Sequence, residues 1–263
     1  MPHGSHDKVS PVAGAQTVMR ALDVLSVVRS SAAGVSASEV ARTLDLHLST
    51  VHRALKALLG SGYVAQSENT GRYRLGREAF LLGRAAELDL GLNAVVPVLK
   101  ELRDQTGESV NLVVREGDHG LVILRVDSRS PFRFSQPSGS RVPLHCSSTG
   151  KVILAFSGDL HANVRSLPDL PALTSHTITS STELIANLEE AVIRGYATNL
   201  DERVDGVCGV SAPVLSPSEH FVAALAIQGP TVRFGPRVVS DLGSAAIDAA
   251  ATVAELLPAG YRL

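Results

Sequence analysis

The chain has no long hydrophobic run and only two cysteines. Although 44% of its 263 residues are hydrophobic, no stretch approaches the roughly 18 apolar residues that a membrane-spanning helix needs, and no signal-peptide pattern opens the sequence. Cys146 and Cys208 give no disulfide framework for a chain of this length, which agrees with a reducing compartment. We therefore expect a cytoplasmic protein without a membrane partner, long enough to form two domains.

Common catalytic and metal-binding motifs are also missing. Residues 147–151 resemble a phosphate loop, but the Walker spacing needs glycine and a hydroxyl residue where His145 and Val152 stand. His145 and Cys146 are neighbours on an extended segment, so their side chains would point apart. The nine histidines have none of the tight spacings of a structural zinc site. We expect no catalytic residue, no metal and no cofactor; a metal-responsive regulator and an enzyme acting on a small carboxylate are the alternatives.

The charge is small and unevenly distributed. The net charge is −2, yet residues 1–76 carry eight Lys or Arg against five Asp or Glu, while residues 77–263 carry sixteen against twenty-one. The balance of +3 in the first segment suits a nucleic-acid partner, but it is too small to hold DNA tightly by phosphate neutralisation alone. Because two copies would double the contacts, we expect a homo-oligomer.

Residues 34–75 contain a helix-turn-helix pattern. Ser36-Ala37-Ser38-Glu39 has the spacing of a capping box, which predicts the start of a short helix. Val40, Ala41 and Leu44 form its apolar face. Residues 45–48 are too few for anything but a turn, so the next helix must cross the first at a steep angle.

That second helix has one apolar face and one polar, cationic face. The apolar face carries Val51, Leu55, Leu58 and Leu59, and the polar face carries Ser49, His52, Arg53 and Lys56. A helix of this kind fits the major groove, where its first residues reach base edges. We expect Lys56 to contact phosphate and four residues to contact bases. These four are Ser49, Thr50, His52 and Arg53. The alternative is that Ser49 only caps the helix and that the stripe is an ordinary solvated face.

A β-hairpin is predicted directly after this helix. Residues 63–66 and 72–75 flank the turn-rich loop 67–71, and alternation places Tyr73 and Leu75 inward and Arg72 and Arg74 outward. Two outward arginines form a wing for DNA contact. An upstream helix, residues 15–28, completes the three-helix core; its apolar stripe is Val18, Ala21, Leu22, Leu25 and Val28. The predicted contacts with double-stranded operator DNA are Ser36, Ser49, Thr50, His52, Arg53, Lys56, Arg72 and Arg74.

The second half of the chain alternates helices and strands. Residues 77–92 predict a linker helix whose apolar residues pack either on a partner subunit or on the same chain. Further helices are expected at 94–105, 152–156, 183–194 and 236–257. Strands are expected at 109–115, 120–126, 132–135, 196–200, 207–215 and 221–228. This order favours an α+β domain in which helices cover a mainly antiparallel sheet.

Several separated phrases resemble the IclR-type transcriptional regulators. They are Ser49-Thr50-Val51-His52-Arg53 with Gly62-Tyr63-Val64, Val142-Pro143-Leu144-His145 with Thr149-Gly150-Lys151, Gly195-Tyr196-Ala197, and Ala212-Pro213-Val214 with Gly229-Pro230. The resemblance runs from about residue 15 to residue 257. It implies an N-terminal winged helix, a linker helix, a GAF-like effector-binding domain, and dimers that often pair into tetramers. It also implies a regulator, most commonly a repressor, that responds to a small organic or aromatic acid.

The resemblance also implies where the effector binds. By position, the pocket residues are Leu144, Ser148, Thr149, Asp201, Gly209, Ala226 and Gln228. The chain departs from the family pattern here, because a frequent cysteine is replaced by Gly209 and two frequent serines by Ala226 and Gln228. Cys208 stands one residue earlier, on the opposite face of its strand.

The residues before the helix at 152–156 have a physical reason to bind an acid. Ser147, Ser148 and Thr149 offer hydroxyl and N–H groups at a positive helix end, which suits a carboxylate; plain helix capping is the alternative. Lys151 stands too far into the helix to be a sure ligand. Arg133 and Arg141 either add charge or lie on the surface. The predicted organisation is a disordered tail at 1–14, a winged helix-turn-helix domain at 15–76, a linker helix at 77–92 and a GAF-like domain at 93–263.

Overall fold

A computed structural model describes residues 14–31, 33–216, 218 and 220–258. The predicted tail at 1–14 lies outside these residues except for Gly14. The chain divides into two compact units, residues 1–87 and 88–263. None of the helices in the described ranges combines the length and the hydropathy needed to span a bilayer.

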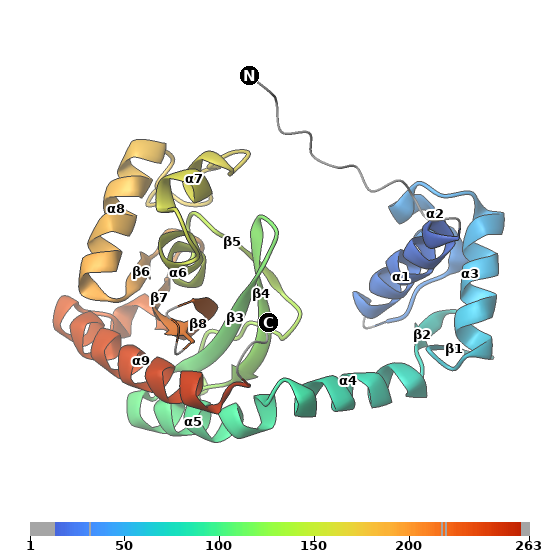
Figure 1. The fold of residues 1–263 in the computed structure, drawn as a ribbon, viewed down its shortest axis with the longest axis horizontal. Helices are drawn as coiled ribbons and strands as arrows, with labels where there is room; N and C mark the ends of the chain where they lie inside the picture. The colour runs from blue at the N-terminus through green and yellow to red at the C-terminus, as the bar shows by residue number, and fades with distance from the viewer. Residues whose placement is uncertain (1–13, 32, 217, 219, 259–263) are drawn as a thin grey trace. The chain divides into compact units, whose positions relative to one another are not determined.

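The first unit is a winged helix-turn-helix, as predicted. It consists of α1 (Ala15–Arg29), α2 (Ala37–Leu44), α3 (Leu48–Gly60) and a hairpin of β1 (Val64–Gln66) and β2 (Tyr73–Leu75) (Figure 1). Its core is small and includes Val24, Val28, Val40, Val51, Leu55 and Tyr73. An additional bridge between Val35 and Tyr73 joins the segment before α2 to the wing.

The capping box predicted for α2 is formed completely. The Ser36 hydroxyl accepts from the Glu39 backbone N–H at 3.2 Å, and the Glu39 carboxylate accepts from the Ser36 N–H at 2.7 Å. The helix ends at Asp45, which adopts a left-handed conformation with φ of 50°. Because α3 begins at Leu48, the turn is one residue shorter than predicted.

The apolar pattern was wrong at four positions in this unit. Val18 and Leu22 are 60% and 54% exposed, and only the second half of α1 is buried, through Val24 and Val28. Leu59 and Leu75 are also exposed, whereas Tyr73 points inward as predicted. A core made by three short helices and a hairpin is too small to cover the full length of α1, so the first turns of that helix carry apolar residues that the unit does not bury.

The linker helix α4 (Arg77–Asp89) has no buried residue. Its apolar side chains Phe80, Leu81, Leu82 and Leu88 are all more than half exposed. The helix stops three residues before the predicted end because Gly91 adopts a φ of 68° and α5 begins at Leu92. The described contacts do not bury this face within its own unit, and both alternatives for its packing stay predictions.

The second unit is built on a six-stranded antiparallel sheet. Its order is β5 (Arg141–Pro143), β4 (His119–Val126), β3 (Ser109–Glu116), β8 (Phe221–Pro230), β7 (Val207–Leu215) and β6 (Ala197–Leu200). Helices α5 (Leu92–Thr106) and α9 (Pro236–Leu256) cover one face; α6 (Ser148–Phe156), α7 (Leu160–Arg165) and α8 (Ser181–Arg194) lie on the other (Figure 1). A short 3-10 helix, Thr231–Arg233, precedes α9.

Four points of the prediction for this unit need correction. Residues 132–135 form no strand, and the strand beyond β4 is β5, which the sequence did not predict. The short helix α7 was also missed. Helix α6 begins four residues earlier than predicted, at Ser148. The segment 132–135 is held by side chains instead of a strand ladder: Ser109 Oγ donates to Phe134 O at 2.7 Å, and Arg233 donates to Phe132 O at 3.2 Å.

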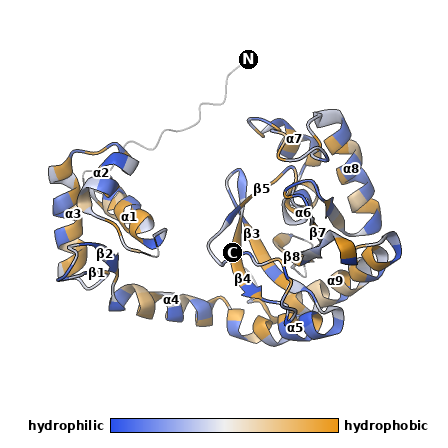
Figure 2. Ribbon diagram, turned by 180° about the vertical axis from the view of Figure 1, so that it is seen from behind, coloured by the Kyte–Doolittle hydropathy of each residue, from blue (hydrophilic) through white to orange (hydrophobic). Residues whose placement is uncertain are grey.

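The two faces of the sheet differ in chemistry. Alternate residues of the central strands, such as Val110, Leu112, Val210, Leu225 and Ile227, form the apolar core under α5 and α9. The hydrophobic colouring of β3 and β4 in Figure 2 reflects this core. The intervening residues point to the α6 face, because successive side chains of a strand alternate. On that face several of them are polar, and the candidate effector site lies there.

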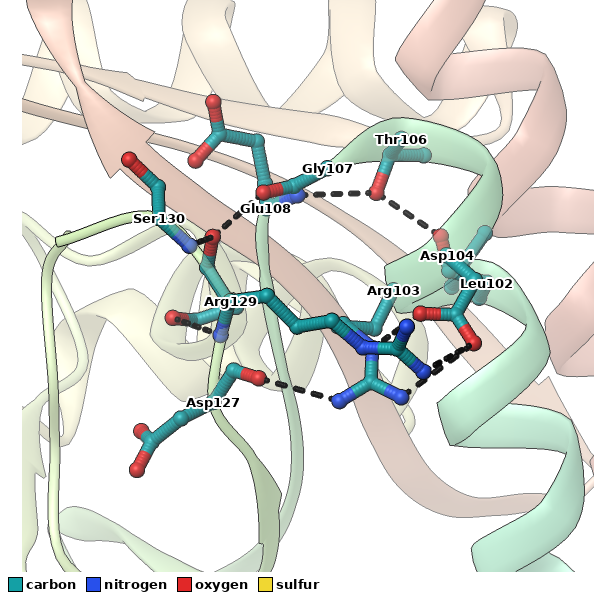
Figure 3. Close-up of polar contacts among 11 residues, drawn as sticks. Leu102, Arg103, Asp104, Thr106, Gly107, Glu108, Asp127, Arg129 and Ser130 are labelled. Carbon is teal, nitrogen blue, oxygen red and sulfur yellow. Dashed lines mark hydrogen bonds and ion pairs between the residues drawn. The ribbon is translucent and has the colours of Figure 1, made fainter. Parts of the chain in front are cut away.

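The loop that follows β4 is fixed by a polar network where α5 ends (Figure 3). Arg103 pairs with Asp104 at 2.6 Å and donates to Asp127 O at 3.3 Å, while Arg129 reaches the other oxygen of Asp104 at 3.1 Å. Ser128 is tied in as well, since its N–H donates to Ser109 Oγ at 3.0 Å. Because Ser109 also donates to Phe134 O, this network holds the loop from Asp127 to Phe134 against the start of β3.

Candidate DNA-contacting surface and effector-binding cluster

The polar face of α3 is exposed and has no internal partners. Ser49, His52, Arg53 and Lys56 are exposed, and Thr50 is half-buried. Across the described residues, no side-chain hydrogen bond or ion pair uses any of these five side chains. The N-cap of α3 is His47, so Ser49 does not cap the helix. The opposite face packs through Val51 and Leu55. The helix therefore presents a cationic, donor-rich ridge to an external partner.

The wing arginines differ from each other. Arg72 was predicted to point outward, but its guanidinium turns back, donating to Gly34 O at 2.9 Å and pairing with Glu39 at 2.7 Å. Arg74 is exposed, and among the described residues its side chain donates one hydrogen bond, of 3.4 Å, to Ala33 O. The Ser36 N–H and the Arg72 guanidinium hold the pKa of Glu39 below its usual range. Arg72 and Ser36 thus fix the wing and α2 to each other, and Arg74 is the freer arginine.

Two rows of residues cross the sheet on the face toward α6. In one row Asn199, Gly209, Gln228 and Ser109 are aligned by strand register; in the next row Ala197, Ser211, Ala226 and Asn111 are aligned. Every member of both rows is buried, and five of the eight are polar. Asn111 Nδ2 donates to Gln228 Oε1 at 2.9 Å, joining the rows. The predicted residues Gly209, Ala226 and Gln228 therefore lie together, although they come from two strands.

The first turn of α6 sits directly on these rows. Ser211 Oγ donates to Ser148 Oγ at 2.7 Å, and a Cβ added at Gly209 would lie 2.8 Å from Ser148 Oγ. Ser147 is the N-cap and accepts from Gly150 N at 3.0 Å. A Cβ at Gly150 would collide with the Leu144 backbone. Glycine at positions 150 and 209 thus allows α6 to approach both the preceding segment and β7.

Lys151 and Glu202 form a buried ion pair behind this turn. Lys151 is fully buried, and its Nζ lies 2.6 Å from Glu202 Oε1. Burial raises the pKa of Glu202 and lowers that of Lys151, while the attraction between the two charges opposes both shifts. The Glu202 N–H donates to Asn199 Oδ1 at 2.8 Å, so the pair is connected to the first row of the sheet. We call the two rows, the first turn of α6 and the Lys151–Glu202 pair the buried polar cluster.

Asp201, a predicted effector residue, does not join this cluster. Its carboxylate accepts from Gly206 N at 2.7 Å and from Thr231 Oγ1 at 2.6 Å. Thr231 also contacts Cys208, whose side chain belongs to the apolar core under α9. Asp201 has a φ of 61°, and this left-handed residue turns the chain so that the next side chain, Glu202, faces α6. The carboxylate beside Lys151 is thus that of Glu202, and the role of Asp201 in effector binding stays a prediction.

Among the described residues, three buried side-chain atoms in or beside the cluster lack a hydrogen-bond partner: Asn111 Oδ1, Gln136 Nε2 and Glu202 Oε2. Their side chains are at least nine-tenths buried. Gln136 Oε1 accepts from Arg203 at 3.1 Å, which places Arg203 beside them. Buried polar groups in proteins are nearly always paired, because an unpaired one costs about 1–3 kcal/mol. These atoms therefore indicate a position for a bound polar molecule.

Other predicted candidates lie outside the cluster or are inert. Arg133 is exposed and donates to Ser130 O, and Arg141 pairs with Glu116 at the surface. His145 contacts Pro171 O at 3.1 Å, and burial raises the pKa of the Cys146 thiol to about 11. Among the described residues, no three His, Cys, Asp or Glu side chains come together as a set of metal ligands.

Sequence reasoning missed Asn111, Gln136, Lys151, Glu202, Arg203 and Ser211. A signal for some of them was present. Ser109 and Asn111 interrupt a buried strand at alternate positions, and so do Gly209 and Ser211, which marks one face of each strand as polar. Lys151 interrupts an apolar helix. Nothing in the local pattern identifies Gln136 or Arg203, because the loops that carry them have no periodicity.

A winged helix-turn-helix unit with a free cationic ridge, followed by a domain with a buried polar cluster, defines a DNA-binding regulator. Residues 17–68 match the IclR helix-turn-helix domain, and residues 87–255 match the C-terminal domain of bacterial IclR transcriptional regulators. The chain therefore belongs to the IclR family of bacterial transcriptional regulators.

Relatives within this family cover nearly the whole chain. The HTH-type transcriptional regulator BhcR of Paracoccus denitrificans is 32% identical over 240 residues, which span 90% of this chain and 85% of BhcR. The HTH-type transcriptional repressor AllR of Klebsiella pneumoniae is 33% identical over 225 residues, spanning 85% and 83%. An IclR homolog from Microbacterium hydrocarbonoxydans, solved in complex with 4-hydroxybenzoate, superposes with a TM-score of 0.79 at 25% identity, covering 91% of this chain and 99% of that chain.

Proposed function

We propose that this regulator is a repressor that binds a roughly palindromic operator as a dimer and changes its operator affinity when a small organic or aromatic acid binds in the C-terminal unit. The observation that carries the DNA-binding part is the exposed polar face of α3, whose side chains have no partner among the residues that the structure describes. A DNA-binding regulator of this bacterial family would act in the cytoplasm, where the chromosome lies.

Each residue of the ridge would have its own role. Arg53 is the best candidate for a bidentate base contact, because arginine matches the two acceptors of guanine in the major groove. Ser49, Thr50 and His52 precede it on the same face and would contact neighbouring bases. Lys56 and Arg74 would neutralise phosphates. Arg72 and Ser36 would act indirectly by holding the wing against α2.

The charge balance and the exposed apolar surface support dimerisation. The first 76 residues have a balance of only +3, so one copy provides few phosphate contacts. The apolar residues of α4 and the first turns of α1 are unburied within the chain. A second copy would cover such surfaces and place two recognition helices about 34 Å apart. Pairing of two dimers into a tetramer is a further possibility that the resemblance implies.

The effector would bind against the buried polar cluster of the C-terminal unit. The three unpartnered polar atoms support a ligand there, and the AllR and 4-hydroxybenzoate relatives support repression and an acid as ligand class. The ligand must bind one arrangement of the paired DNA-binding units more tightly than another, since equal affinity shifts no equilibrium.

We infer that the effector is bound without being chemically changed. With a pKa of about 11, Cys146 is not a thiolate nucleophile at neutral pH. Lys151 is held by Glu202 instead of being free to attack. His145 points one ring nitrogen at a backbone carbonyl.

Selection from a random duplex library tests the DNA-binding proposal. The full chain should enrich a palindrome whose half-sites are about 10 base pairs apart. The double variant Phe80→Ser/Leu81→Ser, measured by analytical ultracentrifugation, should shift the protein toward monomer and lose the palindrome. Enrichment of no sequence, or of a single half-site by a monomeric wild type, contradicts the proposal.

A thermal-shift screen tests the effector proposal. Small carboxylates, aliphatic and aromatic, are added to the full chain, and a ligand at a hundred times its dissociation constant should add about 2.7 kcal/mol of stability. Each stabilising acid is then added to the complex with the selected operator. An acid that stabilises the protein but leaves operator affinity unchanged contradicts the effector role.

A further inference from the structure

We propose, building on the effector role above, that the effector is a small aliphatic acid that carries hydrogen-bond donors, such as hydroxyl or amide N–H groups, beside its carboxylate. Arg203 and Gln136 bind the carboxylate, and Glu202 with the Asn111–Gln228 pair receives the donors. This narrows the ligand class from organic or aromatic acids to donor-bearing aliphatic ones.

The side chains on the sheet side of the cluster are small or polar; the one large aliphatic residue of the predicted pocket is Leu144, which lies beside the first turn of α6. The two rows across the sheet contain glycine, alanine, serine, asparagine and glutamine, and the first turn of α6 adds Ser148 and Thr149. None of these residues is aromatic or a large aliphatic. An aromatic ring gains its affinity from flat apolar contact area. These walls offer hydrogen bonds instead, which fits a ligand with a high density of polar groups.

The unpartnered acceptors define what the ligand must bring. Glu202 Oε1 accepts from Lys151, whereas Glu202 Oε2 and Asn111 Oδ1 accept nothing. A carboxylate oxygen only accepts hydrogen bonds, so the ligand supplies an O–H or N–H there. The Asn111–Gln228 pair can reverse its donor and acceptor roles by turning both amides. The acceptor at Glu202 is unaffected by such a reversal, so the requirement for a donor persists.

The charges define the other end of the ligand. Lys151 and Glu202 neutralise each other. Arg203 makes no ion pair with a carboxylate of the described residues, and its only side-chain partner there is Gln136 Oε1. The unpaired Gln136 Nε2 adds a donor beside this guanidinium. A carboxylate matches two adjacent donors of which one is cationic. The cluster thus pairs a carboxylate end with a donor end.

Matched pairs of acids test this inference on the full chain. Malate is compared with succinate and lactate with propionate, since each pair differs by one hydroxyl; glutamine, benzoate and 4-hydroxybenzoate complete the set. Affinities are measured by isothermal titration calorimetry. We expect at least one donor-bearing aliphatic acid to bind, at least tenfold more tightly than its matched acid and than either aromatic acid.

Three variants separate the two ends of the site. Asn111→Leu should reduce the preference for the hydroxylated member to less than threefold. Gln136→Met should weaken both members of a pair equally. Asn187→Ala is the matched control, because Asn187 Oδ1 is also buried and unpartnered but lies on α8, outside the cluster; it should leave the affinities unchanged. If Asn111→Leu does not fold, the affinities of the matched acids for the wild-type chain still test the inference.

The outcomes distinguish the two proposals. Preferential binding of an aromatic or deoxy acid, or no binding by any donor-bearing acid, overturns the inference about ligand class. If an aromatic acid both binds and alters operator affinity, the effector role survives while this inference fails. If a hydroxylated acid binds with the predicted dependence on Asn111 but operator affinity is unchanged, the ligand class holds and the regulatory role fails.

Discussion

The ridge on α3 and the cluster under α6 both contain polar groups without a partner, but in opposite environments. Arg53 and Lys56 are exposed to water, which satisfies them. Asn111, Gln136 and Glu202 are buried, and each has an atom that nothing satisfies. An exposed unpaired cation costs little free energy, whereas a buried unpaired atom is destabilising. The unpaired atoms of the buried cluster therefore indicate which groups a ligand must supply. The ridge indicates DNA as a partner only because it lies on the second helix of a winged helix-turn-helix.

We expect charge changes in the buried cluster to lower the free energy of unfolding more than any other substitution considered below. Lys151→Met would leave Glu202 buried without its counter-charge, and we expect a loss of about 3–5 kcal/mol in the free energy of unfolding. Urea denaturation of the full chain measures it. The double variant Lys151→Met/Glu202→Leu should recover most of the loss, because an apolar pair replaces the ion pair. A single variant as stable as the wild type would contradict the burial of the pair.

Close packing of α6 on the sheet should be the next most sensitive feature. Gly209→Ala places a Cβ 2.8 Å from Ser148 Oγ, and the overpacking should cost about 1–3 kcal/mol. Removing the Ser148 hydroxyl in the variant Gly209→Ala/Ser148→Ala should restore part of the lost free energy of unfolding. Ser148→Ala alone is the control. If Gly209→Ala unfolds at the same urea concentration as the wild type, α6 is not seated on β7 as described.

The ridge should behave in the opposite way, affecting DNA binding without affecting folding. Arg53→Ala should leave the free energy of unfolding within about 0.5 kcal/mol of the wild type and weaken binding to the selected operator by about 1–3 kcal/mol. Lys56→Ala is the comparison, since a phosphate contact is lost equally on operator and on random DNA. An equal loss on both DNAs for Arg53→Ala would show that it contacts only phosphate.

A smaller effect is expected at the cap of α2. Ser36→Ala removes the acceptor of the Glu39 N–H, which should cost about 1 kcal/mol. Ser38→Ala, one position beyond the first helical residue and without a capping bond among the described contacts, serves as the control. Equal effects of the two substitutions would exclude a specific role of the cap.

The smallest effect is a dependence on acid pH. The pKa of Glu39 lies below its ordinary value of 4.5 in the folded chain. A carboxyl with a lowered pKa stabilises the fold above its ordinary pKa, and this contribution is lost as the pH falls through the lowered value. Glu39→Gln should therefore flatten the fall in urea midpoint on the acid side of pH 4.5. If the urea midpoint of Glu39→Gln falls with acid pH as steeply as that of the wild type, the bonds of Glu39 to Ser36 and Arg72 contribute nothing measurable to stability.

Most of the secondary structure was predictable because its causes are local. Ser36 and Glu39 specify the start of α2, the end of α5 lies one residue beyond its predicted end, before the left-handed Gly107, and β7 has its predicted bounds. The predictions failed where burial depends on distant neighbours. Val18 and Leu22 have the helical spacing of a core face, but the unit has no element to cover them. Residues 132–135 are apolar enough for a strand, but side-chain anchors hold them instead.

The candidate sites were predictable to different degrees. The ridge of α3 follows from helical periodicity, since residues three and four apart share a face. The position of the cluster followed from the family resemblance, which located Gly209, Ala226 and Gln228 on one face. It missed Glu202, because a single left-handed residue, Asp201, decides which neighbouring side chain turns toward α6.

The sequence by itself determined the winged helix and the order of the two units, because capping, turn length and helical periodicity act over a few residues. Only the tertiary structure decided which polar groups meet. Asn111 and Gln228 are 117 residues apart and join because β3 lies beside β8. Lys151 and Glu202 are 51 residues apart and join because α6 packs across β8, β7 and β6, and Glu202 follows β6 directly. Such contacts depend on strand order and helix placement, which no local pattern encodes.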